Sequence, residues 1–341
     1  MKNKLVIPAA GMSTRFGLDK PKFLLSHPSG RPMIFESITC LGENMLQAYD
    51  EIIVITLEDF LSNDQAHVLS DSLEQVTKVP SRVVLLQKPT KSPVDTVLRF
   101  IEGEREDSSI SIKDCDNAIS FDASIVAPEK NSVAYASLQK FTRVVAANKA
   151  YLELDVMGGV RNIVEKQVVS PTFFVGFSSF ESMSSFVSAA NSLSETGPEA
   201  YISDVIRHQM AEGVSFASHE VESYSDFGTA EDWARLKESY ETLVVDISSL
   251  VKEKPLELSS IAFDDGALAR LRRHISTSPN STVVVTTNAD DRVLEIQIEA
   301  LLQNEGVNCR VLSGIPSWGR LVALTSSDES NFEAVTFGKS L

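Results

Sequence analysis

The stretch PAAGMSTRFGLDKPK at residues 8–22 carries the strongest fold signal in this chain. The apolar run at residues 5–7 precedes it and predicts a β-strand. Four small residues follow, Ala9, Ala10, Gly11 and Ser13. Their backbone N–H groups can approach a phosphate chain without clashes from large side chains. Three cations come next, Arg15, Lys20 and Lys22. The stretch therefore predicts a strand that ends in an anion-binding loop.

This loop stands in an acidic protein. The 341 residues include 47 Asp and Glu against 31 Lys and Arg, which gives a net charge of −16. Such a chain repels nucleic-acid backbones and anionic lipid surfaces, so we expect neither as a partner. The loop has neither the GxxxxGK[ST] spacing of a P-loop nor the GxGxxG spacing of a dinucleotide site. An anionic ligand would need the few cations to be concentrated where it binds.

Cysteines and histidines form no recognisable metal or disulfide pattern. Cys40, Cys115 and Cys309 lie far apart without a CxxC pair, which argues against a zinc knuckle or a disulfide framework and fits a reducing compartment. No apolar run reaches the ~18 residues of a membrane helix. The apolar start is too short for a signal peptide, so we interpret it as a first strand. These features predict a cytoplasmic protein.

Short β-branched runs alternate with helical patterns along the first two thirds of the chain. Strands are predicted at residues 51–56, 81–86 and 117–121, a helix at residues 33–48, and a hairpin at residues 151–155 and 160–164. Such alternation is typical of an α/β fold with a mostly parallel, Rossmann-like sheet and helices on both faces.

The alternation then restarts. We predict strands at residues 243–246, 282–286, 308–312 and 321–324, and helices at residues 231–241, 265–274 and 292–305. A length of 341 residues is itself typical of roughly two domains. We therefore expect one domain at residues 1–238 and a smaller α/β domain at residues 239–341.

The loop at residues 8–22 resembles the AAGxGTR…PK signature of the sugar-nucleotide pyrophosphorylases, a superfamily of nucleotidyltransferases. Ser13 replaces the usual second glycine. The resemblance implies a nucleotide-binding loop formed by Ala9, Ala10, Gly11, Met12, Ser13 and Thr14. It also implies that Lys22 acts on the α-phosphate of the nucleotide and Arg15 on the β- and γ-phosphates.

Further segments resemble this superfamily in the expected order. Residues 86–96 resemble a loop that meets the nucleobase, with contacts implied for Gln87, Thr90, Ser92 and Asp95. Asp116 resembles the ligand of the catalytic Mg²⁺, with Asp114 as the competing candidate two residues away. Asp226, in a DxGT element that continues to Trp233, resembles the second metal ligand. Thr229 and Asp232 of that element are expected to cap the following helix.

The acceptor side of the predicted site rests on weaker motifs. The resemblance implies that Lys166 holds the phosphate of the second substrate and that Glu165 accepts its hydroxyl hydrogen bonds. Thr172 and Gly176 would line the same site. Asp204 is a further candidate, although a carboxylate at a helix N-terminus fits it equally well.

The implied activity is Mg²⁺-dependent condensation of a nucleoside triphosphate with a phosphorylated small molecule, with release of pyrophosphate. A sugar 1-phosphate used in surface or capsule polysaccharide synthesis is the expected acceptor. One alternative is a cytidylyltransferase acting on phosphocholine, a polyol phosphate or a phosphonate. A second is a nucleotide-binding scaffold without catalysis. The base and the acceptor stay open at this stage.

Residues 243–251 resemble the hhhDxDGT motif of haloacid-dehalogenase-type phosphatases, as found fused in capsule-biosynthesis proteins. Asp246 stands at the nucleophile position, but Ser248 and Ser249 replace the acid and the glycine. Residues 324–325 read Leu-Thr where such proteins carry a metal-binding Asn-Asp pair. We therefore expect a phosphatase-like domain without phosphatase activity, kept for packing, a homodimer or partner binding.

Overall fold

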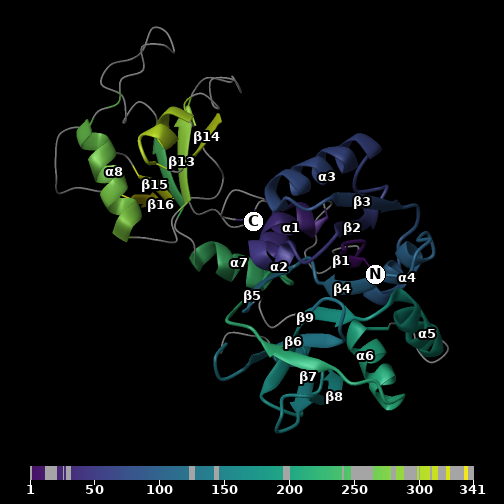
Figure 1. The fold of residues 1–341 in the computed structure, drawn as a ribbon. Coiled ribbons are helices and arrows are strands. Elements are labelled where there is room, and N and C mark those ends of the chain that lie inside the picture. The colour runs from purple at the N-terminus through teal and green to yellow at the C-terminus, as the bar shows by residue number, and fades with distance from the viewer. Residues whose placement is uncertain are drawn as a thin grey trace. The chain divides into compact units, whose positions relative to one another are not determined.

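The computed structural model describes residues 2–11, 21–25, 27, 32–122, 127–141, 146–194, 200–239, 242–246, 263, 265–277, 282–287, 298, 300–307, 309–313, 320–322 and 334–336. Two compact units make up the chain (Figure 1). The first comprises Met1–Leu25 and Arg31–Trp233, and the second comprises Ser26–Gly30 and Ala234–Leu341. The division falls within α7 (Ala230–Ser239).

The first unit is built on a mixed β-sheet. Within the described residues its order is β10-β6-β9-β4-β1-β2-β3, with the β7–β8 hairpin beside β9. The parallel part consists of β1 (Asn3–Pro8), β2 (Glu51–Leu57), β3 (Ser81–Leu86) and β4 (Ser109–Lys113). The rest consists of β6 (Ser132–Ser137), β7 (Ala150–Leu154), β8 (Val160–Glu165), β9 (Thr172–Phe180) and β10 (Ala217–Glu220). Because β9 runs antiparallel to both β4 and β6, it joins the two parts.

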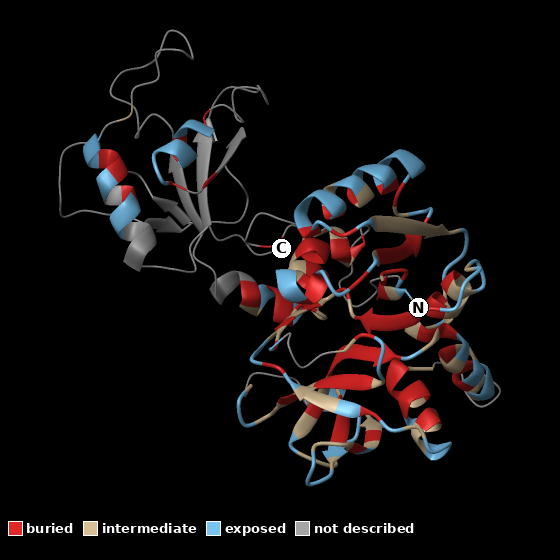
Figure 2. Ribbon diagram, viewed as in Figure 1, coloured by how far each residue is buried: buried red, intermediate tan, exposed pale blue. Residues whose placement is uncertain are grey.

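Helices cover both faces of this sheet, which explains why its parallel strands are continuous apolar runs. Along β1, Leu5 and Ile7 join one core while Val6 joins the other, as the two-residue alternation of a strand requires. The first core includes α1 (Met33–Thr39), α2 (Glu43–Leu46) and α3 (Asn63–Thr77). The second includes α4 (Pro93–Ile101), α5 (Met183–Ser194) and α6 (Ile202–Ala211). Figure 2 shows the buried residues concentrated between these layers, so the predicted α/β architecture of this unit is confirmed.

Two local predictions need correction. The helical run predicted at residues 33–48 is two helices, because Gly42 between them has a φ of 81°. With a ψ of 154° this residue is not helical, and it stands at the N-cap of α2, so it separates the two helices. The strand predicted at residues 117–121 exists as β5 (Asn117–Ser120) but does not extend the parallel sheet. It pairs instead with β11 (Ser223–Asp226) in an antiparallel ladder.

The second unit contains a five-stranded sheet in the order β14-β13-β12-β15-β16 within the described residues. Its strands are β12 (Thr242–Asp246), β13 (Thr282–Thr287), β14 (Cys309–Ser313), β15 (Arg320–Val322) and β16 (Ala334–Thr336). Helix α8 spans Asp265–Thr277, and residues 300–304 are helical as well. Asp246 stands in register with Thr286 on the neighbouring parallel strand. Ser248, Ser249, Leu324 and Thr325 lie outside the described residues, so the phosphatase-like assignment stays a prediction.

None of the helices in the described part of the chain combines the length and apolarity that a membrane crossing requires.

The aromatic cluster on β9 offers a test of the second core. Phe180 is fully buried. The centre of its ring lies 5.0 Å from the ring centre of Phe186 and 5.8 Å from that of Phe216, and both contacts are edge-to-face. Because Phe180→Ala leaves a cavity, we expect it to lower the free energy of unfolding by about 3–5 kcal/mol. Urea denaturation of the full chain followed by far-ultraviolet circular dichroism measures this. Val68→Ala on α3, where the valine is 65% exposed, should change the same quantity by about 0.5 kcal/mol or less, and equal midpoints for the two variants would contradict the assignment.

Candidate active site

The four parallel strands place the predicted functional segments at one edge of the sheet. Gly11 follows β1, Gln87 follows β3 and Asp114 follows β4. Carboxyl ends of parallel strands meet at the same edge, which is where α/β sheets bind ligands. The predicted functional segments therefore meet at this edge of the sheet.

A buried lysine organises the turn that follows β4. Lys113 is fully buried, and its Nζ donates to the backbone oxygens of Asp114 at 3.0 Å and Asn117 at 2.9 Å. It also contacts the Asn117 Oδ1 at 2.7 Å and the Ser37 Oγ at 3.0 Å. Burial lowers the pKa of this ammonium. Because Lys113 holds both ends of the turn, the position of Asp116 between them is fixed.

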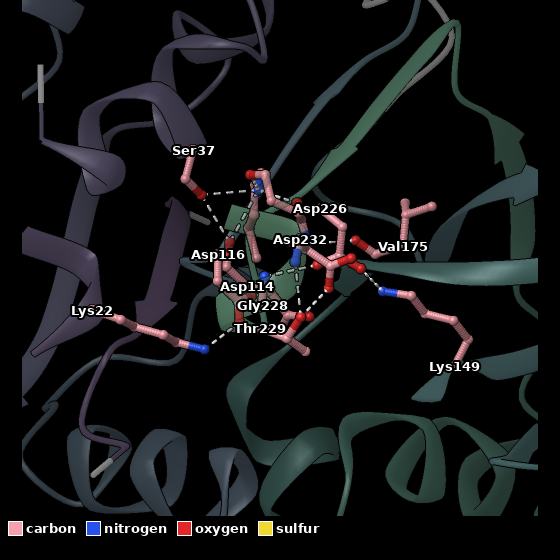
Figure 3. Close-up of polar contacts among 12 residues, drawn as sticks. Lys22, Ser37, Asp114, Asp116, Lys149, Val175, Asp226, Gly228, Thr229 and Asp232 are labelled. Atoms are coloured by element: carbon pink, nitrogen blue, oxygen red, sulfur yellow. Dashed lines mark hydrogen bonds and ion pairs between the residues drawn. The ribbon is translucent and has the colours of Figure 1, made fainter. Parts of the chain in front are cut away.

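The β5–β11 ladder brings a second aspartate to this turn. Asp226 is in register with Asn117, and the Phe227 N–H donates to the Asp116 carbonyl at 2.8 Å. The Gly228 N–H then donates to the Asp226 Oδ1 at 2.8 Å. A Cβ on Gly228 would lie 3.0 Å from the Asp226 Oδ1 and 3.3 Å from the Asp116 Oδ2. The two carboxylates thus face the same small space (Figure 3).

Each of these carboxylates is bonded to a lysine, and the two lysines approach from opposite sides (Figure 3). Lys22, from the short 3-10 helix Lys22–Leu24, contacts the Asp116 Oδ2. Lys149, directly before β7, contacts the Asp226 Oδ2. Burial alone would lower the pKa of Lys22, but the Asp116 carboxylate raises it above its ordinary value. Burial alone would likewise raise the pKa of Asp116, and Lys22 holds it below the usual range.

The third aspartate, Asp114, sits in a different environment. Burial raises its pKa to about 7, and the neighbouring Asp116 carboxylate adds to the rise. Its N–H donates to the Gly176 carbonyl at 2.8 Å, and its side chain lies directly against Gly176. Asp114 therefore packs against β9, while Asp116 faces Asp226. Of the two candidates for a metal ligand, the geometry favours Asp116.

The Asp116 and Asp226 carboxylates fit a divalent cation such as Mg²⁺. Both offer hard oxygen donors to one small space, which is the ligand type this ion takes. In the part of the chain that the structure describes, no group of three or more His, Cys, Asp or Glu side chains is arranged to hold a metal ion. An ion at this position would therefore need ligands beyond these two side chains.

The predicted phosphate loop is described only in part. Ala9 and Ala10 are buried, and Gly11 is exposed. The Ala9 N–H already donates to the Ile55 carbonyl at 2.8 Å, so contrary to expectation it is not available to a phosphate. The remaining predicted members, Met12, Ser13, Thr14 and Arg15, lie outside the described residues.

The segment predicted to meet the nucleobase, residues 86–96, is only partly a loop. Its second half is the first turn of helix α4. The Ser92 Oγ accepts the Asp95 N–H at 3.2 Å and caps α4, which begins at Pro93. Asp95 accepts the Lys91 N–H at 2.8 Å, and the Thr90 hydroxyl lies 2.7 Å from that of Thr96. These three predicted residues thus have structural partners of their own. Gln87 is exposed at the end of β3, where a ligand could reach it.

On the acceptor side, Glu165, Lys166 and Asp204 lie around α6 and the end of β8, whereas Thr172 and Gly176 lie on β9. The Glu165 Oε2 accepts the Ser203 hydroxyl at 2.7 Å, and the Lys166 Nζ donates to the Tyr201 hydroxyl at 2.6 Å. Thr172 donates to the Leu152 carbonyl at 2.5 Å. Asp204 accepts the Tyr201 N–H at 3.0 Å at the start of α6, as the alternative helix-end interpretation expects. The predicted cap of α7 is confirmed, because the Thr229 Oγ1 accepts the Asp232 N–H at 3.1 Å.

Sequence reasoning missed Lys149, Tyr224 and the organising role of Lys113. The hairpin pattern contained a signal for Lys149, because extending the predicted strand pair by two residues brings it opposite Lys166. The Lys166 N–H indeed donates to the Lys149 carbonyl at 2.9 Å. Tyr224 had no such signal, because its role depends on a ladder between distant segments.

No protein-family model and no curated protein matches the sequence. Solved structures do match, among them the nucleoside-diphosphate-sugar pyrophosphorylase from Vibrio cholerae RC9, with a TM-score of 0.57 and 18% identity over 68% of this chain and 98% of that one. The inositol-1-phosphate CTP transferase from T. maritima matches with a TM-score of 0.53 and 12% identity over 70% and 97%. A UDP-glucose pyrophosphorylase complexed with UDP-glucose matches with a TM-score of 0.50 and 19% identity over 69% and 97%. The matched 68–70% of this chain therefore shares the fold of these structures.

The contact between Gly176 and Asp114 gives a prediction for this site. Gly176 has a φ of 74°, and a Cβ there would come 2.0 Å from the Asp114 Oδ2. Gly213 has a φ of 92° but open space around its Cβ position. We expect Gly213→Ala to cost about 1–2 kcal/mol of stability from backbone strain alone, and Gly176→Ala to cost more because it adds the clash.

Thermal unfolding of the two variants measures the difference. A lower melting temperature for Gly176→Ala than for Gly213→Ala is expected. Equal melting temperatures would show that Asp114 does not pack against β9 as described.

Proposed function

We propose that this protein is a Mg²⁺-dependent nucleotidyltransferase that joins a nucleoside triphosphate to a phosphorylated small molecule and releases pyrophosphate. The observation that carries the proposal is the pair Asp116 and Asp226, facing one space between Lys22 and Lys149. The pair lies at the ligand-binding edge of a sheet whose fold is that of nucleotidyltransferases. Two carboxylates and two ammonium groups suit the transfer of a phosphoryl group between anions.

The reaction needs little covalent chemistry from the protein. An oxygen of the acceptor phosphate attacks the α-phosphorus, and the bond from that phosphorus to the bridging oxygen of pyrophosphate breaks. Since the attacking oxygen is already anionic, no general base is required. Mg²⁺ held by Asp116 and Asp226 would supply charge neutralisation between the two phosphates. Lys22 would stabilise the α-phosphate, and Arg15 the departing pyrophosphate.

For the acceptor we favour a sugar 1-phosphate, which would give a nucleotide-activated sugar for surface polysaccharide synthesis. The similarity to two pyrophosphorylases of nucleotide sugars supports this choice. Glu165 and Lys166, placed together at the end of β8, would bind the sugar hydroxyls and phosphate. The site we propose thus runs from the carboxyl edge of β1 and β4 to the β7–β8 hairpin.

A second candidate keeps the transfer and changes both substrates. The similarity to an inositol-1-phosphate CTP transferase supports CTP as the donor and a polyol phosphate as the acceptor. Both candidates use the same pair of carboxylates, so substrate trials separate them.

The test is pyrophosphate release with Mg²⁺, crossing CTP, UTP, dTTP, GTP and ATP with sugar 1-phosphates, inositol 1-phosphate, phosphocholine and an aminoalkylphosphonate. We expect turnover with one pair, abolished by chelation and reduced roughly a hundredfold or more in Asp226→Ala. Asp64→Ala on the exposed start of α3 should leave the rate unchanged.

If nucleotide raises the melting temperature of the protein but no acceptor gives pyrophosphate release, the result favours the scaffold alternative over catalysis. Turnover that persists undiminished in Asp226→Ala would overturn the assignment of the carboxylate pair.

For the second unit we propose a phosphatase-like fold without phosphatase activity. The support is Asp246 in register with Thr286 at the ends of neighbouring parallel strands, together with the serines at positions 248 and 249. The full chain is expected not to hydrolyse p-nitrophenyl phosphate with Mg²⁺. Hydrolysis that disappears in Asp246→Asn would contradict this expectation.

A further inference from the structure

We propose that Lys149 is an exchangeable cation, which neutralises Asp226 before the metal ion binds and then binds the phosphate of the acceptor. This inference rests on the proposed function and adds a residue to it. It starts from a lysine that lies outside the sequence motifs and yet contacts one of the two carboxylates of the site.

The contacts of Lys149 form a compact cluster with Tyr224 and Asp226. The Lys149 Nζ contacts the Asp226 Oδ2, and it lies 2.5 Å from the Tyr224 hydroxyl oxygen and 5.2 Å from the centre of that ring. The Tyr224 hydroxyl donates to the Asp226 Oδ2 at 2.9 Å. The Lys149 and Asp226 side chains are 16% and 19% exposed. Solvent and small ions therefore still reach this cluster.

Both oxygens of Asp226 are already in use. The Oδ1 accepts the Gly228 N–H, and the Oδ2 is bonded to Lys149 and Tyr224. A divalent cation on this carboxylate would stand close to the ammonium of Lys149, and two positive charges at contact distance in a partly buried site repel strongly. Metal binding and the Lys149–Asp226 contact therefore compete.

A displaced Lys149 would remain on the acceptor side of the site. Its backbone carbonyl accepts the Lys166 N–H, so the chain at this point is anchored to the hairpin that carries Glu165 and Lys166. Its flexible side chain can move while the backbone stays in place. An ammonium that has lost its carboxylate binds a phosphate as the next available anion.

Lys113 shows by contrast what a purely structural lysine looks like in this protein. It is fully buried, and four oxygens of the fold surround its Nζ. Lys149 is instead partly exposed, and its anionic partner is one that the metal would take. This difference separates Lys149, whose contact with Asp226 a metal ion would replace, from a lysine that only holds the fold together.

The direct test measures Mn²⁺ binding to the full chain without nucleotide. The electron paramagnetic resonance signal of free Mn²⁺ reports how much of the ion remains unbound. Lys149→Met removes the competing cation, so it is expected to bind Mn²⁺ roughly fivefold more tightly than the wild-type protein. Lys149→Arg keeps the charge and should return the affinity to the wild-type value. Lys140→Met is the matched control, because Lys140 donates to the Val221 carbonyl and lies over the Phe141 ring, and it should leave Mn²⁺ affinity unchanged.

The second readout is kinetic. Lys149→Met is expected to raise the KM for the acceptor by roughly tenfold or more, since a charged hydrogen bond to phosphate is lost, while the KM for the nucleotide changes little. Tighter metal binding together with weaker acceptor binding is a combination that a merely structural lysine would not produce.

The outcomes separate this inference from the proposed function. If Lys149→Met does not bind Mn²⁺ more tightly than the wild-type protein, the proposed exchange of Lys149 for a metal ion is overturned. The same holds if neither protein binds Mn²⁺ detectably. A gain in Mn²⁺ affinity with an unchanged acceptor KM overturns the phosphate role of Lys149. A gain in Mn²⁺ affinity in a protein without turnover on any substrate pair supports the metal competition and counts against the nucleotidyl transfer.

Discussion

The short antiparallel ladder between β5 and β11 is the constraint on which the proposed site depends. It places Asp226 in register with Asn117 and ties Phe227 to Asp116 through one backbone hydrogen bond. Two carboxylates that face one space repel each other unless cations stand beside them. Lys22 and Lys149 meet this need in the structure, and a metal ion with a phosphate chain would meet it in the proposed reaction. Two cations of this acidic protein thus stand beside its paired carboxylates.

Local patterns in the sequence predict much of the fold. The β-branched runs that became β1, β2 and β3 are covered by helices on both faces, so their composition alone marks them as buried strands. The hairpin β7–β8 was equally visible, because it closes locally around a glycine-bearing turn. The break between α1 and α2 was missed, since a single glycine with positive φ interrupts an otherwise continuous helical pattern.

The site was predictable in its motifs and not in its contacts. The family resemblance selected Asp116 and Asp226, but the β5–β11 ladder is what brings these two side chains together. Its two strands are distant in the chain: Ser120 and Ser223, whose hydroxyls are hydrogen-bonded across the ladder, are 103 residues apart. No local pattern encodes such a pairing. For the same reason Lys149 and Tyr224 became visible only in three dimensions. Ser92 and Asp95 show the reverse case, where residues that resemble ligand contacts have capping partners in the fold.

The measurement that tests this account most directly is the position of a bound metal ion. Crystals of the full chain grown with Mn²⁺ and a non-hydrolysable nucleotide would locate the ion through its anomalous scattering. A peak is expected within coordination distance of both Asp116 and Asp226, next to the α-phosphate. A bound nucleotide with the ion elsewhere, or coordinated by Asp114 instead of Asp116, would contradict it.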